Sequence, residues 1–148
     1  MKQVVVIIAC LLLAACGPGD PEAGKRVAEA SALAAYPEVP KPGDVPALQA
    51  AGKPIFKAAG CETCHSSSHE RNGLMGPPLG GVAEAVLAQH KGDPLEARRW
   101  MVKHIRDPQR FPGQHAGTDD YRGSAMPPNG MLKDADLRAL VEFLWHLP

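Results

Sequence analysis

The last segment of the chain has the clearest pattern of hydrophobic and polar positions. From Asp134 onward, apolar residues recur every three or four positions and therefore share one face of a helix. The residues of this stripe are Leu137, Leu140, Val141 and Leu144, and Phe143 and Trp145 widen it. No stretch of the sequence alternates apolar and polar residues over a useful length, as a half-buried strand would. The pattern therefore predicts an all-α domain.

Two further helices are predicted in the middle of the chain. The one that begins at Pro94 is the better marked, because Asp93 can cap the N-terminus and Pro94 suits the first helical position. Its apolar face, at intervals of four, is formed by Ala97, Met101 and Ile105. This helix should end before Pro108. Residues 82–89 are predicted to form a shorter helix.

A fourth helix is predicted over residues 47–60. Pro54 conflicts with this prediction, because a proline inside a helix removes a backbone hydrogen bond and clashes with the preceding turn. The helix therefore either begins near Lys53, with Pro54 in its first turn, or is kinked at Pro54. Ile55 and Phe56 supply its apolar side. Long loops rich in glycine and proline join the helices, so a ligand is needed to fill the middle of such a domain.

The N-terminus predicts export from the cytoplasm. Lys2 precedes an apolar run over residues 4–13, which is too short to span a bilayer comfortably. The small residues that follow lead to Cys16 and resemble the lipobox of bacterial lipoproteins, which implies a signal peptide of residues 1–15 and a lipid anchor on Cys16. Secretion with cleavage after Ala15, or an uncleaved anchor, would also place the domain outside the cytoplasm. We therefore expect the domain on the periplasmic side of a bacterial membrane.

Residues 16–46 are predicted to be a lipidated N-terminus followed by a tether. The segment is rich in proline, and proline-rich linkers are extended and semi-rigid. Its prolines are Pro18, Pro21, Pro37, Pro40, Pro42 and Pro46. Residues 25–35 are rich in alanine and can form a brief helix. The alternative is that the segment packs on the domain as an irregular arm, and in either case the domain proper is expected over residues 47–148.

Charge and cysteine content narrow the possible functions. The sequence has 16 basic and 16 acidic side chains, and it has no basic stripe of the kind that binds nucleic acid. Of the four cysteines, Cys10 lies in the apolar run and Cys16 in the lipobox. Cys61 and Cys64 remain for chemistry, and none is left for a structural disulfide.

Cys61-Glu62-Thr63-Cys64-His65 is the strongest chemical signal in the chain. A C-x-x-C-H motif is the attachment site of a c-type haem, because each thiol adds across one vinyl group and the histidine becomes the proximal iron ligand. A zinc site would need further ligands at a set spacing, and a thioredoxin-like redox pair would need a βαβ context. The sequence provides neither, although a chance occurrence of the motif stays possible.

The sixth ligand of such an iron decides between electron transfer and ligand chemistry. The candidates are Met75, Met101, Met126, Met131, His69, His90, His104, His115 and His146. Met101 lies on the apolar face of a helix, so packing is its expected role. Met126 differs, because it lies in a loop of small and rigid residues that fixes the direction of its side chain.

From about Val45 to the end, the chain resembles class I cytochromes c. The motifs that carry the resemblance are, in order, Gly52-Lys53-Pro54-Ile55-Phe56, the C-x-x-C-H motif, Gly76-Pro77-Pro78-Leu79, Ile105-Arg106-Asp107-Pro108, Ala125-Met126-Pro127 and the final apolar helix. The resemblance implies a small cytochrome c fold, in which three to five helices wrap around one covalent haem c. It also implies that the helix around Phe56 crosses the last helix around Leu140 and Phe143.

The resemblance also assigns site residues. It makes His65 and Met126 the axial pair of the iron, and the carbonyl of Pro77 the acceptor for the ring N–H of His65. It places Leu79 on the haem face. Trp100 either lies near the haem edge or a propionate, or is an ordinary core aromatic.

The function implied is one-electron transfer rather than catalysis. A His/Met pair favours ferrous iron, and redox partner proteins would meet an exposed haem edge through a small, transient contact. One alternative is an electron-accepting haem subunit of a dehydrogenase or oxidase complex. Another is a haem enzyme or sensor with an open sixth position, for which His104 or His115 would be the distal donor.

Overall fold

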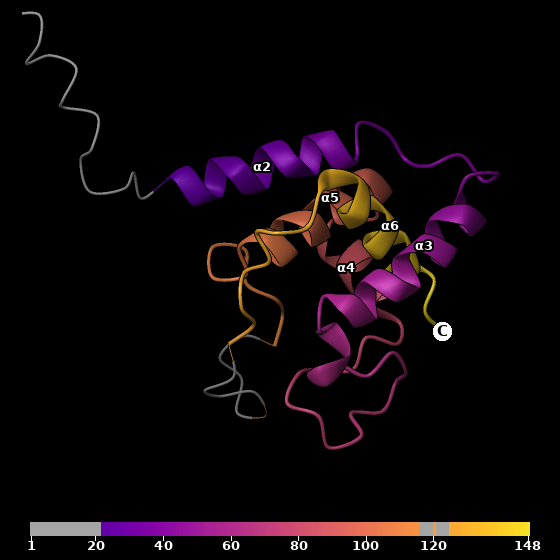
Figure 1. The fold of residues 1–148 in the computed structure, drawn as a ribbon, viewed down its shortest axis with the longest axis vertical. Helices are drawn as coiled ribbons and strands as arrows, with labels where there is room; N and C mark the ends of the chain where they lie inside the picture. Colours follow the sequence, from indigo (N-terminus) through magenta and orange to yellow (C-terminus); the bar gives the residue numbers. More distant parts are fainter. Residues whose placement is uncertain (1–21, 116–119, 121–124) are drawn as a thin grey trace, which may run out of the picture.

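The structure, a computed structural model, describes residues 22–115, 120 and 125–148. Within these residues the chain forms helices and no strands. The elements are α2 (Ala23–Ala35), α3 (Val45–Ala58), the 3-10 helix η1 (Cys61–Thr63), α4 (Val82–Gln89), α5 (Pro94–Arg106) and α6 (Asp134–Trp145) (Figure 1). The predicted all-α class is confirmed.

The closest helix crossing is that of α3 and α6. A Cβ added at Gly52 would collide with the carbonyl oxygen of Ala139 and lie 2.6 Å from the Cβ of Phe143, so only glycine lets the two backbones approach this closely. One turn later, the rings of Phe56 and Phe143 pack with their centroids 5.6 Å apart and their planes at 51°. The predicted crossing of these two helices is confirmed.

The starts of α4, α5 and α6 agree with the sequence prediction, and the predicted cap of α5 is present. The carboxylate of Asp93 accepts hydrogen bonds from the backbone N–H groups of Leu95, at 2.9 Å, and Glu96, at 3.1 Å, and α5 begins at the next residue, Pro94. Helix α4 has the predicted bounds, and α6 begins at Asp134 as expected.

Helix α3 differs from its prediction. It begins at Val45, not near Lys53, and continues through Pro54 to Ala58. Pro46 stands in its first turn, where a missing N–H costs nothing. Pro54 itself is exposed, while Gly52 and Phe56 are buried against α6. Packing of that buried face offsets the lost hydrogen bond inside the helix.

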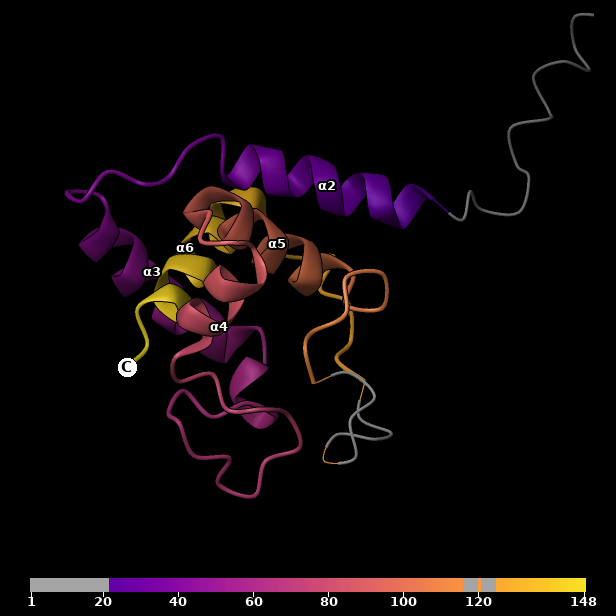
Figure 2. The same ribbon diagram turned by 180° about the vertical axis from the view of Figure 1, so that it is seen from behind.

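The structure contradicts the expected tether over residues 23–36. Helix α2 packs on α5 and α6, as both views show (Figures 1 and 2). Its buried face consists of the small residues Ala28, Ser31, Ala32 and Ala35. Tyr36 follows with no exposed surface at all. The domain therefore begins before residue 47, whereas the predicted signal peptide and Cys16 lie outside the described residues.

Arginines from α5 and α6 bind the C-terminal half of α2. They donate hydrogen bonds at its end, where backbone carbonyls lack helical partners and the helix dipole favours positive charge. The bonds are Arg138 Nη1 to the carbonyl of Ala35 at 2.7 Å, Arg99 Nε to the carbonyl of Tyr36 at 2.9 Å, and Arg106 Nε to Ser31 Oγ at 3.2 Å. Helix α2 is thus an integral part of the domain.

A buried polar cluster lies beneath the end of α2. The carboxylate of Glu142 has no exposed surface and accepts a 2.6 Å hydrogen bond from Nε of Arg98. The hydroxyl of Tyr36 is 2.9 Å from Oε1 of Glu142 and 2.9 Å from the carbonyl of Arg138. Burial, and then the charge of Glu142, raise the pKa of Tyr36 far above its usual value. The cluster is paired internally, as buried charges must be.

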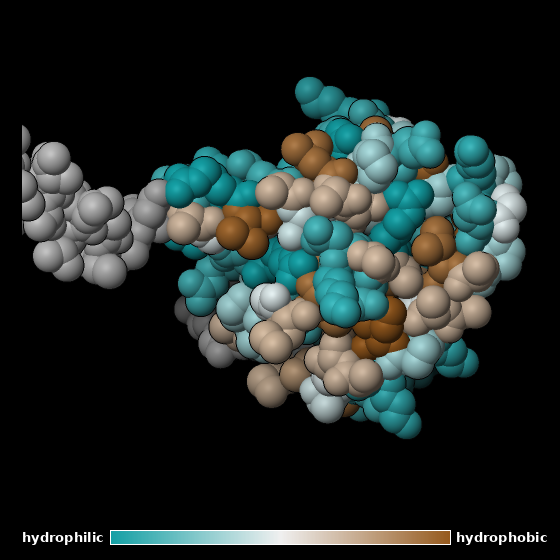
Figure 3. Space-filling view, turned by 45° about the horizontal axis from the view of Figure 1, so that its top comes forward, coloured by the Kyte–Doolittle hydropathy of each residue, from teal (hydrophilic) through white to brown (hydrophobic). Residues whose placement is uncertain are grey.

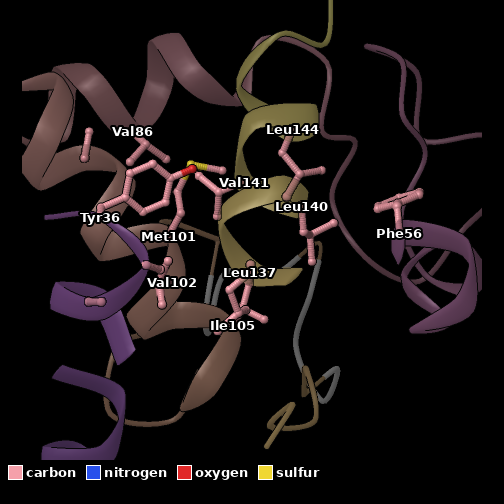
Figure 4. Close-up of a cluster of buried hydrophobic side chains, with 13 residues drawn as sticks. Tyr36, Phe56, Val86, Met101, Val102, Ile105, Leu137, Leu140, Val141 and Leu144 are labelled. Atoms are coloured by element: carbon pink, nitrogen blue, oxygen red, sulfur yellow. The ribbon is translucent and has the colours of Figure 1, made fainter. Parts of the chain in front are cut away.

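The hydrophobic core joins these elements around α6. Figure 4 shows Tyr36, Val86, Met101 and Val102 on one side of α6 and Phe56 on the other. On the outer surface, apolar residues are scattered among polar ones (Figure 3). Val27 and Leu33 of α2 are more than half exposed. Among the helices of the described residues, none combines the length and apolar character that a bilayer span requires.

Candidate functional site

The two thiols and His65 lie on a single tight turn. Gly60 ends α3 with a positive φ of 75°, which turns the chain into η1. The backbone N–H groups of Cys64, at 3.2 Å, and His65, at 2.9 Å, both donate to the carbonyl of Cys61. This turn therefore presents the three side chains together.

The thiols are available for covalent attachment. Cys61 and Cys64 are both half-buried and form no disulfide within the described chain. Burial raises the pKa of the Cys61 thiol above its usual value, which favours an uncharged sulfur at this position. Haem attachment converts the thiol into a thioether, which carries no charge at any pH. The half-buried position of Cys61 therefore suits the sulfur both before and after attachment.

The loop that follows fixes the ring of His65. Nδ1 of His65 is 2.8 Å from the carbonyl oxygen of Pro77. A carbonyl only accepts, so Nδ1 carries the proton and Nε2 keeps a lone pair for a metal. Gly76 allows the loop to pass this closely, since a Cβ there would lie 2.6 Å from Cε1 of His65. The hydrogen bond that the resemblance implies is present.

Leu79, Trp100 and Met126, the other residues that the resemblance assigns to the site, come from three different segments. All three are partly buried and pack against the hydrophobic core. Met126 lies in an irregular segment that is tied to α5, because the N–H of Asn129 donates to the carbonyl of Ile105 at 3.0 Å. The preceding residues of the Met126 loop, 121–124, lie outside the described residues.

Trp100 lies between two histidines on the aromatic edge of α5. Its ring stacks on His104, with centroids 5.1 Å apart and planes at 9°, and lies 5.7 Å from the ring of His90. Nε2 of His90 is buried without a hydrogen-bond partner among the described residues. Burial, and then the charge of Lys103, lower the pKa of His90. Trp100 therefore contributes packing here whatever its distance from a haem.

Exposure separates the remaining candidates for the distal ligand. Met75 and Met131 are 61% and 93% exposed, whereas Met101 is buried in the core as predicted. The exposed histidines are His69, His115 and His146, and the half-buried ones are His90 and His104.

The donor set fits a haem better than a bare metal ion. In the described part of the chain, no three His, Cys, Asp or Glu side chains cluster as ligands of one ion, as a structural zinc site requires. The site instead provides two thiols, one oriented imidazole and apolar neighbours. These are the groups that a covalently bound macrocycle with an axial histidine needs.

Comparison with known proteins agrees with this geometry. A family model described as Cytochrome c matches residues 49–148. The match covers the two thiols, His65, Pro77 and Met126, and it leaves α2 and Tyr36 outside. Searches of the curated proteins and of the solved structures find no match.

Proposed function

Because this chain belongs to the cytochrome c family, and such proteins carry electrons through a covalent haem, we propose that it is a periplasmic electron carrier tethered to a membrane. In this proposal one haem c is attached at Cys61 and Cys64, with His65 and Met126 as axial ligands. The observation that carries the proposal is the oriented ring of His65, whose Nδ1 is 2.8 Å from the Pro77 carbonyl immediately after the two thiols.

Each part of the site has a role in electron transfer. When bound, the haem supplies an iron that cycles between the ferrous and ferric states. Pro77 keeps the proton on Nδ1 of His65 and makes its Nε2 a stronger donor. In this proposal Leu79, which packs against the core, lies on the haem face, excludes water from it and keeps its dielectric low. A low dielectric disfavours the extra positive charge of the ferric state and so raises the potential.

Met126 is the proposed distal ligand. A thioether is a soft ligand that favours ferrous iron, so a His/Met pair gives a higher potential than a pair of histidines. Met126 is partly buried against the core, unlike the fully exposed Met131. Pro127 follows it directly and restricts the backbone at this point.

The ligand assignment can be tested with Met126→Ala, using Met131→Ala as a matched control. Ferric wild-type protein should show the weak charge-transfer band of methionine sulfur bound to iron. Met126→Ala should abolish the band and lower the potential, while Met131→Ala leaves both unchanged. A band that survives in Met126→Ala would refute the assignment.

The anchor is a separate part of the proposal, supported by the sequence that leads to Cys16. With Cys16→Ser, we expect the haem-containing protein to move from the membrane fraction to the soluble periplasmic fraction. Retention on the membrane would instead support an uncleaved helix or a tightly bound partner. The haem spectrum should be identical in both fractions.

A further inference from the structure

Three segments of the chain meet at the side chain of the last residue of α5. In this residue, Arg106, Nε donates to Ser31 Oγ of α2 and Nη1 donates to the carbonyl of Asn129, both at 3.2 Å. Nη2 donates at 3.2 Å to Oδ1 of Asp134, the first residue of α6. The Arg106 side chain is only 9% exposed. Because a guanidinium is planar and rigid, it fixes its three partners relative to one another.

Asn129 is the point at which the segment of Met126 is attached to α5. Its backbone N–H donates to the carbonyl of Ile105 at 3.0 Å, and its own carbonyl accepts the bond from Arg106. Among the described residues, no other backbone hydrogen bond holds residues 125–128. The position of this segment against the helix therefore depends on Asn129.

The constraint at Asn129 reaches Met126 through two prolines. Pro127 and Pro128 separate the two residues, and each ring fixes the backbone angle φ near about −65°. Three residues span at most roughly 11 Å even when they are fully extended. Holding Asn129 therefore leaves Met126 few backbone positions, and its side chain is partly buried against the core.

We propose that Arg106 is a positioning residue for Met126 as a ligand of the haem iron. The inference rests on the proposed function, because it requires haem at the thiol turn and Met126 in the distal position. By holding Asn129, Arg106 restricts the loop before the ligand binds, so that less conformational entropy is lost when the bond from sulfur to iron forms.

Helix α2 takes part in this arrangement through Ser31. The hydroxyl of Ser31 binds Nε of Arg106 and so helps to orient the nitrogen that reaches Asn129. Since α2 lies outside the residues that the family model matches, this contact is a feature of the N-terminal extension. The docked extension thereby stabilises the distal ligand as well as the fold.

Added imidazole measures the strength of the bond between Met126 and iron. It can bind the iron only when Met126 has left, so its apparent affinity is proportional to the fraction of molecules in the open state. A variant that loosens the loop of Met126 increases this fraction. The apparent affinity for imidazole should then rise, although the variant touches neither the haem nor the imidazole.

The experiment is a titration of the ferric, haem-loaded full chain with imidazole. Arg106→Gln should bind imidazole about tenfold more tightly than the wild type, as expected for the loss of a hydrogen bond from a charged group. Ser31→Ala should increase the affinity by a smaller factor. Arg138→Gln is the matched control, because it removes a hydrogen bond to the Ala35 carbonyl of α2 without touching Asn129, and it should leave the affinity unchanged. Unchanged affinity in Arg106→Gln, or an equal increase in Arg138→Gln, would overturn the inference.

The same titration in a Met126→Ala background separates positioning from general loosening of the fold. There, adding Arg106→Gln should change nothing, because no methionine bond is left to weaken, and a further increase would overturn the inference. If Arg106→Gln does not fold, Ser31→Ala decides, and no increase in that variant counts against the proposal. If Met126→Ala loses the methionine band while Arg106→Gln leaves the affinity unchanged, this inference fails and the proposed ligand stands. If Met126→Ala keeps the band, the proposed ligand fails, and the inference fails with it.

Discussion

The two ends of this domain are stabilised in different ways. At the α2 end, Glu142, Arg98 and Tyr36 pair with one another, and arginines satisfy the last carbonyls of α2. At the other end, residues 60–80, 110–115 and 125–130 consist mainly of loops, and in the loop from Cys61 to Leu79 the Pro77 carbonyl holds the ring of His65. The polypeptide completes the first end by itself, while the second leaves thiols, a lone pair and apolar walls for a cofactor.

Because of this difference, the stability of the fold and the chemistry of the haem site can be changed by separate substitutions. Substitutions in the buried cluster should weaken the fold without altering the haem spectrum. Substitutions at the thiols should remove the haem without unfolding the α2 end. Experiments that change one end and measure both test the distinction directly.

The largest effect is expected from Cys61→Ser combined with Cys64→Ser. Without thioether bonds, covalently attached haem should be lost completely, as denaturing gels stained for haem will show. Hydrogen exchange should then accelerate over residues 60–80, because the loop loses the group it surrounds, while α2 and α6 stay protected. Thr63→Ser, on the exposed side of the same turn, should retain haem. Equal loss of protection in α2 would refute the separation.

Glu142→Ala should produce the largest loss of stability without a change at the haem. It leaves Arg98 buried and unpaired, which typically costs about 3–5 kcal/mol of the free energy of unfolding. Denaturant unfolding of the haem protein measures this cost, and the visible spectrum of the folded state should not change. His146→Ala removes an exposed neighbour of Glu142 and should have little effect. A shifted spectrum in Glu142→Ala would mean that the two ends are coupled.

Gly52→Ala should have an intermediate effect. The added Cβ meets the carbonyl of Ala139, so α3 and α6 must separate, at a cost of about 1–3 kcal/mol. Since α3 leads into the thiol turn, this variant probes how far strain travels from one end to the other. Gly43→Ala, where no atom lies within 4 Å of the added group, should change the stability by about 0.5 kcal/mol or less. Similar denaturant midpoints of unfolding for Gly52→Ala and Gly43→Ala would contradict the close approach of α3 and α6.

The smallest effect concerns the pH dependence of stability. Burial lowers the pKa of His90 in the folded state, so the unfolded chain takes up a proton first as the pH falls. Neutral His90 therefore makes its full contribution to the free energy of unfolding above about pH 6.5, and this contribution decreases below that pH. In His90→Gln, the free energy of unfolding should therefore fall less steeply than in the wild type as the pH is lowered. A titration of the His90 ring by NMR should give a pKa below the ordinary value, and an ordinary or higher pKa would contradict the expectation.

The sequence predicted those elements whose signals are local. Helix α5 has its cap and first-turn proline within four residues, and α6 has a continuous apolar stripe, so both were located correctly. The hydrogen bond from His65 to Pro77 followed from the resemblance, because both groups lie in ordered motifs. Local chemistry was enough in these cases.

The missed features depend on contacts between distant parts of the chain. Helix α2 buries alanine and serine, which give almost no hydrophobic signal, and its fixation depends on arginines from α5 and α6. The alanines at positions 28, 32 and 35 share one helix face, and this pattern was the one indication in the sequence that α2 packs on the domain. The continuity of α3 through Pro54 depends on packing against Ala139. The orientation of the His104 ring depends on its contacts with Phe111 and Trp100, which could not be inferred from the sequence alone.

The docking of α2 also limits the reach of the molecule. Between Cys16 and Ala23 the chain has six residues, which extend to roughly 25 Å, whereas a tether running to residue 47 would extend to roughly 100 Å. With the anchor proposed at Cys16, the redox domain would be confined to a thin layer above the bilayer. Encounters with partners in that layer would depend on surface density and lateral diffusion, and the local concentration would far exceed the bulk value. A carrier anchored in this way would exchange electrons mainly with partners in the same membrane.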